Sequence, residues 1–168
     1  MFWINRSETK TLDPANFCLR LTFNETNQMP WDFPVEINCF EASAYCRWLS
    51  KKLGKAIRLP TEDEHYAILK HINYDFKKDQ TNLGVVHASP TPVDKYNVGG
   101  IFDPTGNVWQ WTRTPMYPFT GFEVHPIYDD FTMPTFDDKH NMIKGGSWIS
   151  TGNLRLPFSR YAFRRHFF

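Results

Sequence analysis

Residues 106–112, Gly106-Asn107-Val108-Trp109-Gln110-Trp111-Thr112 (GNVWQWT), are the stretch that decides how this chain folds. The Gly106-Asn107 pair is typical of a tight turn, and the residues after it predict a strand. Trp109 and Trp111 are two positions apart, so on an extended strand they project to the same face. Because indoles bury large areas, this pattern favours two core anchors of a β-rich domain. Direct contact with a ligand is the alternative.

Length and composition point to one globular domain. The 168 residues are enough to bury a core without disulfides or metals, and we expect a single domain over residues 1–168. The formal net charge is +1, which does not favour binding to nucleic acid or to an anionic membrane surface. The 12 prolines and an aromatic content of 17% indicate a loop-rich fold in which aromatic side chains fill the spaces between irregular segments.

The cysteines, the first residues and the apolar runs of the chain indicate the cellular compartment that we expect for it. Cys18, Cys39 and Cys46 have no metal-binding spacing, and three cysteines cannot all pair within one chain. Reduced thiols are typical of cytosolic proteins. The first residues lack the features of a signal peptide, and no apolar run approaches membrane-spanning length. We therefore expect a soluble, intracellular and most simply cytoplasmic protein without membrane insertion.

Two helices are predicted from their capping signals. The first covers Asn38 to Leu53, with Asn38 as N-cap, Glu41 as its reciprocal partner and Gly54 as the stop. Its apolar stripe consists of Ala42, Tyr45, Cys46, Leu49 and Leu53. Cys39 and Cys46 lie two turns apart on it, and buried apolar packing is favoured over a ligand or redox pair.

The second helix runs from Thr61, its N-cap, to about Ile72, with Glu64 at the reciprocal capping position. His65 and His71 are six residues apart, so a helix does not place both rings on one metal ion. Separate packing or surface roles are expected for the two histidines.

Most of the remaining chain reads as loop. Residues 74–100 show little periodicity, and residues 113–141 are rich in Pro, Phe, Tyr and Asp, a composition that favours a ligand-binding loop. Met142 to Ile149 predict a strand interrupted by Gly145 and Gly146, which implies a bulge or a close backbone approach. The end, residues 159–168, alternates basic with aromatic residues.

Four motifs together resemble one known domain family. RLPTEDEHY at residues 58–66, GNVWQWT at 106–112, GGSW at 145–148 and the arginine-rich tail are similar to the formylglycine-generating-enzyme (sulfatase-modifying factor) domain. The resemblance implies a C-type-lectin-like α+β fold, with two helices, an irregular antiparallel sheet and long loops.

One branch of that family is more similar than the others. Residues 115–153 and the tail SRYAFRRHFF at 159–168 resemble the sulfoxide synthase of ovothiol biosynthesis, 5-histidylcysteine sulfoxide synthase. The related enzymes of ergothioneine biosynthesis share a looser pattern. The resemblance implies oxidative joining of a cysteine thiol to a histidine imidazole with dioxygen and a non-haem iron. In that family three histidines hold the iron, mainly from a preceding helical DinB-like domain.

The sequence departs from the synthase pattern at several places. It shows neither the DinB-like domain with its histidine triad nor the following methyltransferase domain, and the family's next strand, with a Gly-Phe-Arg pattern, is also missing. We therefore expect no iron on this chain alone, iron only if it pairs with a DinB-like chain, and an unpaired strand edge at the end. Formylglycine generation is not expected, because residues 150–168 contain no cysteine pair for copper. In the family a glutamate near the GNVW turn can bind calcium, and Gln110 stands there with only a neutral carbonyl oxygen. A calcium ion is accordingly not favoured.

The synthase resemblance also implies candidate site residues. Tyr128 is the candidate catalytic phenol near iron and substrate, and one more packed aromatic is the alternative. Arg160, Arg164 and Arg165 are candidates for binding a substrate carboxylate, since guanidinium groups pair with carboxylates through two hydrogen bonds. Their alternative is a solvated basic strand, or structural ion pairs with Asp129, Asp130, Asp137 or Asp138. Trp148 and Trp111 would line the pocket or fill the core beneath it.

Three functions are compatible with these features. The preferred hypothesis is a degenerate, non-catalytic lectin-like domain, a pseudoenzyme that acts as a subunit or protein-binding module with a protein partner over its C-terminal strand. The second makes the chain the substrate-binding part of an iron-dependent 5-histidylcysteine sulfoxide synthase, with a DinB-like chain as its partner. The third is a small-ligand or carbohydrate-binding module, which rests on fold analogy alone.

Overall fold

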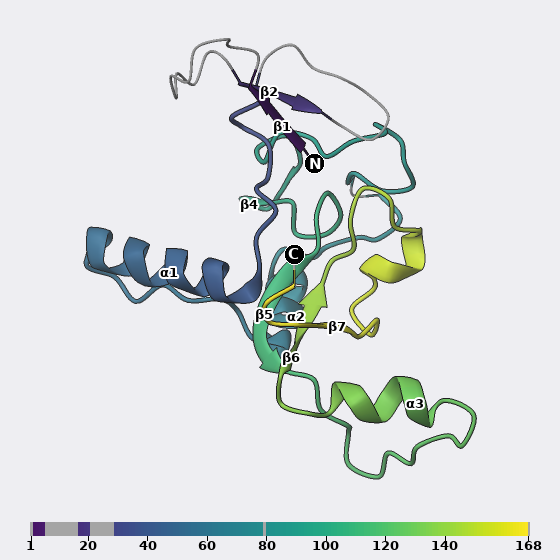
Figure 1. The fold of residues 1–168 in the computed structure, drawn as a ribbon. Helices are drawn as coiled ribbons and strands as arrows, with labels where there is room; N and C mark the ends of the chain where they lie inside the picture. Colours follow the sequence, from purple (N-terminus) through teal and green to yellow (C-terminus); the bar gives the residue numbers. More distant parts are fainter. Residues whose placement is uncertain (1, 6–16, 21–28, 79, 168) are drawn as a thin grey trace.

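The computed structural model describes residues 2–5, 17–20, 29–78 and 80–167. At its centre is a three-stranded antiparallel sheet with the order β5-β6-β7 (Figure 1). Its strands are β5 (Gln110–Pro115), β6 (His140–Lys144) and β7 (Tyr161–Arg164). Together with two long helices and extensive loops, this sheet confirms the predicted α+β fold class.

The GNVWQWT stretch forms the expected turn and strand. Gly106 and Asn107 both have positive φ angles, of 76° and 59°, and β5 begins at Gln110. Trp111 pairs with Ile143 of β6 in the antiparallel register. The turn therefore leads into a strand that carries Trp111 and pairs with the central strand of the sheet, whereas Trp109 lies just before that strand.

The first predicted helix is confirmed as α1 (Cys39–Leu53), with Asn38 and Glu41 in a capping box and Gly54 ending it at φ 63°. The predicted apolar stripe is not buried as a whole. Tyr45 and Leu53 are 57% and 53% exposed, and Ala42 in the first turns is buried. The helix projects from the body of the molecule, so its amphipathic pattern is covered only near its start (Figure 1).

The second helix is confirmed as α2 (Glu62–His71), again with a capping box at Thr61. It packs on the sheet: the backbone N–H of Glu62 donates to Oγ1 of Thr114 in β5 at 2.9 Å. Glu62, His65 and Leu69 are buried along it. A charged residue and a histidine thus take positions that an apolar residue would ordinarily occupy.

Two small antiparallel pairs lie outside the central sheet. One joins β1 (Phe2–Asn5) to β2 (Phe17–Arg20), and the other joins β3 (Asn97–Val98) to β4 (Ile101–Phe102). Within the described residues no helix is both long and apolar enough to cross a bilayer.

The strand predicted over Met142 to Ile149 is wrong in its second half. β6 ends at Lys144, because Gly145 and Gly146 adopt φ angles of 91° and 75° and turn the chain away from the sheet. A 3-10 helix, η3 (Gly152–Arg155), follows before β7.

The loop between β5 and β6, residues 116–139, is called the Tyr128 loop below. It contains the short helix α3 (Asp129–Thr132) and the 3-10 helix η2 (Met133–Thr135). In Figure 1 this loop extends away from the sheet, and α3 lies on the part that returns toward β6. The loop predicted at residues 113–141 is thus present, shortened by the strand residues at both ends.

The two faces of the central sheet have different neighbours. On one face Thr112, Met142 and Lys144 are buried, and Lys144 reaches the carboxylate of Glu62 in α2. On the other face Trp111 and Ile143 stand in one cross-strand row. This second face lines a pocket.

Candidate functional site

A pocket of about 400 Å³ opens beside the second face of the central sheet. Aromatic side chains form much of its wall, and two other segments complete it, residues 34–37 and residues 88–90. The aromatic lining residues are Trp109, Trp111, Trp148, Phe163 and Phe167. We call this cavity the tryptophan pocket; its volume is that of a small-molecule site.

Hydrogen bonds and ring contacts fix the tryptophans. The indole N–H of Trp111 donates to the carbonyl oxygen of Ile37 at 3.0 Å, which holds the segment 34–37 over the sheet. Trp109 packs against Tyr161 of β7, with ring centroids 5.4 Å apart. The backbone N–H of Trp148 donates to the carbonyl oxygen of Asn107 at 2.9 Å. The two sequence motifs GNVW and GGSW therefore meet at the pocket.

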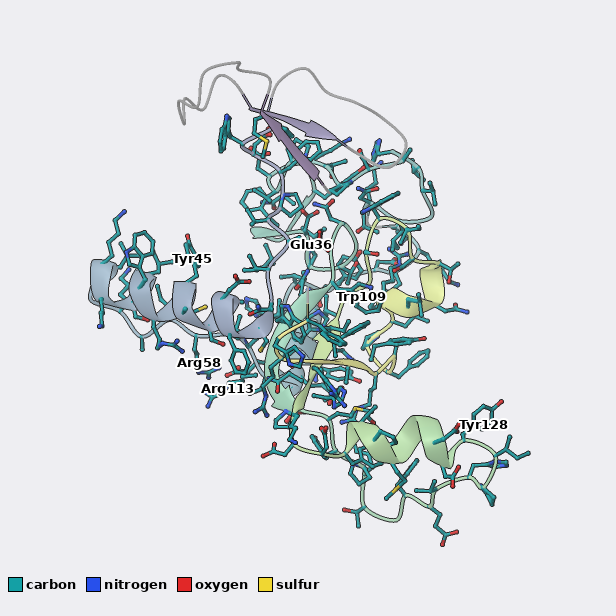
Figure 2. All side chains as sticks on the ribbon, in the orientation of Figure 1. Glu36, Tyr45, Arg58, Trp109, Arg113 and Tyr128 are labelled. Carbon is teal, nitrogen blue, oxygen red and sulfur yellow. The ribbon has the colours of Figure 1, made fainter. Side chains whose placement is uncertain are left out.

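Glu36 brings a carboxylate to this largely apolar wall. Figure 2 shows Glu36 and Trp109 in the same central region of the molecule, at the junction of the segment 34–37 and the sheet. A carboxylate beside indole faces favours a flat or cationic ligand, because both groups attract positive charge.

The turn behind the pocket is held by the buried amide of Asn107. Its Oδ1 accepts from the backbone N–H of Thr91 at 2.9 Å and from Nδ2 of Asn82 at 3.2 Å. Its Nδ2 donates to the carbonyl oxygen of Thr91 at 3.0 Å and to Oδ2 of Asp103 at 2.8 Å. One side chain thus ties the turn to the segment that forms the opposite pocket wall.

Asp103 is the titratable group of this turn. Burial raises the pKa of its carboxyl to about 6, partly offset by the hydrogen bond from Asn107. Its Oδ1 is buried without a hydrogen-bond partner among the described residues. Burial therefore makes the ionised form of Asp103 unfavourable in free energy. Asp103 lies behind the pocket and not in its wall.

Tyr128 lies apart from the tryptophan pocket. It precedes α3, it is 60% exposed, and its ring is 5.8 Å from that of His125. In Figure 2 Tyr128 is at the outer end of the Tyr128 loop, well separated from Trp109 and Glu36. The structure does not bring the candidate phenol and the pocket together in this arrangement. Trp148 and Trp111, by contrast, both line the pocket.

The three terminal arginines have different surroundings. Arg160 donates from Nε and Nη2 to the carboxylate of Glu62, both at 3.1 Å, in a largely buried two-point pair. Arg165 donates to Oδ1 of Asn141 at 2.6 Å and reaches Asp138 at 3.4 Å, one of the anticipated structural partners. Arg164 is exposed on β7. The partner of Arg160 was not anticipated, since Glu62 reads in the sequence as an ordinary first-turn helix acid.

The histidines do not fit an iron centre of the three-histidine type. His65 is buried against the carbonyl oxygen of Pro104, and burial lowers the pKa of its ring to about 4. His140 is paired with Asp137 at 2.7 Å, and His87 contacts the hydroxyl of Tyr96 at 2.7 Å. Within the described residues no three His, Cys, Asp or Glu side chains form a metal-binding group.

The side-chain amide of Gln110 is held within the turn. Its Nε2 donates to the backbone carbonyl oxygen of Asp103 at 2.6 Å. Gly145 packs against the same amide, where an added Cβ would lie 3.5 Å from Nε2. A hydrogen bond joins the two sides of the turn at this position.

Comparison with known proteins identifies the family. The pattern of the sulfatase-modifying factor enzyme 1-like domain matches residues 6–167. The chain belongs to this family. The fold class and the motifs GNVWQWT and GGSW are those expected for it, with both motifs at the tryptophan pocket.

The chain is similar to proteins named for hercynine oxidation and for ergothioneine biosynthesis. The chain is 29% identical over 187 residues to a hercynine oxygenase of Mycobacterium tuberculosis, covering 99% of the chain and 40% of that protein. It is 37% identical over 73 residues to ergothioneine biosynthesis protein 1 of Neurospora crassa, covering 43% of the chain and 8% of that protein. The relationship to sulfoxide synthases is therefore shown, and these relatives are named for hercynine and ergothioneine rather than for ovothiol, so the predicted closer match to the ovothiol branch is not shown. The chain spans about 40% of the length of the hercynine oxygenase.

Solved structures support the fold alone. PvdO from Pseudomonas aeruginosa matches with a TM-score of 0.63 and 18% identity, over 92% of this chain and 64% of that chain. Treponema denticola variable protein 1 matches with a TM-score of 0.63 and 20% identity, over 91% of this chain and 72% of that chain.

Sequence reasoning missed two contributors to the site. Glu36 lines the pocket although it is a single acid in an unremarkable segment, and the nearest signal was the proline-bracketed stretch from Pro30 to Pro34, which ends two positions before it. Glu62 is buried with two cations, and no spacing rule links it to Lys144 or Arg160. The positions of Glu36 and Glu62 both result from packing between segments that are far apart in the sequence.

Proposed function

We propose that this chain is the lectin-like, substrate-side domain of a sulfoxide synthase, whose site is completed by a metal-bearing domain or partner chain. The observation that carries the proposal is the match to a hercynine oxygenase over 99% of the chain. The tryptophan pocket supports it, because a domain of this kind needs a built cavity for a small organic substrate.

The pocket chemistry favours a flat, cationic ligand derived from histidine. Indole faces attract cations and stack on planar rings, and the carboxylate of Glu36 adds an opposite charge. The relatives' name indicates hercynine as the substrate of those proteins. For this chain, histidine (the ovothiol-type substrate) and hercynine (the ergothioneine-type substrate) are the two candidates.

The metal would come from outside the described residues. A DinB-like domain or chain that supplies the three histidines is our proposed partner, consistent with the separate positions of the histidines here. Tyr128 would then face the metal only after this partner has docked, since in the structure it lies away from the pocket.

Ligand binding tests the proposal directly. Titration of the purified chain with L-histidine and with hercynine, followed by tryptophan fluorescence and calorimetry, should show saturable binding of one of them. Trp148→Leu should weaken that binding about tenfold or more, as expected when an aromatic contact with a cation is removed. Trp31→Leu is the matched control, because Trp31 is 63% exposed and outside the pocket wall. Absence of binding by both compounds, or equal effects of the two substitutions, would contradict the assignment of this pocket.

A protein-binding role is the second candidate, and the exposed edge of the sheet favours it. β7 is the last strand in the order β5-β6-β7, so it can pair with an added strand. Tyr45 and Trp48 also stand exposed on α1 with ring centroids 5.5 Å apart. Co-purification with a DinB-like chain, with thiol-dependent oxygen consumption only after mixing, would favour the two-chain enzyme. A stable complex without activity would favour the degenerate subunit, and stoichiometric iron with oxygen consumption by this chain alone would exclude both.

A further inference from the structure

The Tyr128 loop leaves the sheet after β5 and returns to it at β6, and two arginines of the C-terminal segment contact its two ends. Arg160 contacts the start of the loop and Arg165 contacts its end. We propose that these two arginines are positioning residues that set the geometry of the Tyr128 loop and thereby the orientation of Tyr128. The proposal rests on the proposed function in so far as it takes Tyr128 as a site residue.

Arg160 is bound on two sides. Its Nη1 donates to the carbonyl oxygen of Tyr117 at 2.9 Å, and its guanidinium lies 4.1 Å from the ring centroid of Phe119 and 4.8 Å from that of Tyr117. Its Nε and Nη2 are taken by Glu62. The two-point donor edge that a substrate carboxylate would need is therefore already occupied by a carboxylate.

Glu62 is itself held in place. It begins α2, where its backbone N–H is bonded to β5, and its Oε1 lies 3.3 Å from the fully buried Nζ of Lys144. That ammonium also donates to the carbonyl oxygens of Pro157 at 2.6 Å and Ser159 at 2.8 Å, next to Arg160. The start of the Tyr128 loop is thus connected through Arg160 and Glu62 to α2, β5 and the end of β6.

Arg165 holds the returning end in the same way. Its backbone N–H donates to the carbonyl oxygen of Lys139 at 3.2 Å, its Nε to Oδ1 of Asn141 at 2.6 Å, and its Nη2 reaches Asp138 at 3.4 Å. Arg164 lies between Arg160 and Arg165 in the sequence. Its guanidinium is exposed and has no hydrogen bond to the described residues. Arg164 is the arginine whose donors stay available.

Local amide exchange tests the two contacts separately. In the full chain, Arg160→Lys should accelerate exchange at the start of the Tyr128 loop about tenfold or more, because a charge-assisted hydrogen bond and a ring contact are lost. Arg165→Lys should do so at residues 136–139, and Arg164→Lys should affect neither end. Phe119→Leu is a second variant for the first contact, and because Phe119 is 59% exposed, we expect this variant to fold normally.

A fluorine probe reports whether the ends govern Tyr128. With 3-fluorotyrosine at position 128, Arg160→Lys and Arg165→Lys should shift or broaden the ¹⁹F resonance of the folded protein, whereas Arg164→Lys should leave it unchanged. A role limited to overall stability would lower the unfolding midpoint without changing the folded-state resonance, and this outcome would overturn the proposal. So would unchanged loop exchange in Arg160→Lys, Phe119→Leu and Arg165→Lys. Neither readout needs ligand or activity, so failure of the proposed function leaves this test intact.

Discussion

At the scale of the residue, His65 shows how burial changes the chemistry of one side chain. It is 4% exposed in α2, its Nε2 lies 3.3 Å from the carbonyl oxygen of Pro104, and burial together with the charge of Lys144 lowers the pKa of its ring from 6.5 to about 4. The native protein therefore keeps the imidazole neutral over a range in which the unfolded chain binds a proton. Stability gained from the neutral ring is complete above pH 6.5 and is lost as the pH falls toward 4.

We expect His65→Met to reduce this acid sensitivity, because methionine fills a similar volume without titrating. Between the two pKa values the wild-type protein should lose up to about 3 kcal/mol relative to the variant. Urea unfolding of both proteins at several pH values measures the difference. The raised pKa of Asp103 makes stability fall as the pH rises over part of this range, which is opposite to the effect of His65. Asp103 is present in both proteins, so its contribution cancels in the difference between their free energies of unfolding. Parallel pH profiles for the two proteins would contradict the prediction.

At the scale of the element, two glycines with similar backbone angles have different surroundings. Gly106 in the GNVW turn has φ 76°, and a Cβ added there would lie 2.8 Å from the carbonyl oxygen of Asn82 and would also contact Thr81. Gly54 at the end of α1 has φ 63° and open space around it. Both positions need a left-handed backbone, but the turn at Gly106 also needs the absence of a side chain.

Alanine at each position separates these two requirements. Gly54→Ala should cost about 1 kcal/mol, the strain of a left-handed alanine. Gly106→Ala should cost about 3–5 kcal/mol, because overpacking against the neighbouring chain adds to the same strain. Thermal or urea unfolding checks the difference, and equal losses would show that the Asn82 segment yields to the added methyl group.

At the scale of the whole molecule, the buried cluster of Glu62, Lys144 and Arg160 joins parts of the chain that are far apart in sequence. One carboxylate lies between two cations, and burial lowers the pKa of the Lys144 ammonium despite its pair with Glu62. Lys144 also lies over the ring of Tyr66, 5.1 Å from its centroid. The cluster connects α2, the end of β6 and the segment before β7.

Glu62 supplies the only carboxylate of this cluster, so its removal should lower the free energy of unfolding strongly. We expect Glu62→Gln to destabilise the protein by about 3–5 kcal/mol, the effect of leaving buried charges without their partner. Arg58→Met is the control: Arg58 pairs with Glu64 at 2.6 Å on the surface, where solvent screens the pair, and the unfolding midpoint should change little. Similar urea midpoints for the two variants would show that the buried cluster contributes no more than an exposed pair.

Local signals in the sequence determined much of this protein. Asn38 and Gly54 predicted the ends of α1, Thr61 predicted the start of α2, and the GNVWQWT motif predicted a turn and a strand, because caps and turns depend on neighbouring residues. The motifs together were sufficient for the fold class and the family.

Tertiary structure alone decided where the side chains of the candidate site lie. It placed Trp111 and Trp148 in a pocket wall with Glu36, paired Arg160 with Glu62 across 98 positions of sequence, and left Tyr128 exposed at the end of its loop. It also left Tyr45 and Leu53 exposed on a helix whose periodicity predicted burial. The physical reason is the same in each case: a side chain's environment depends on which distant segment packs against it, and local spacing carries no information about that segment.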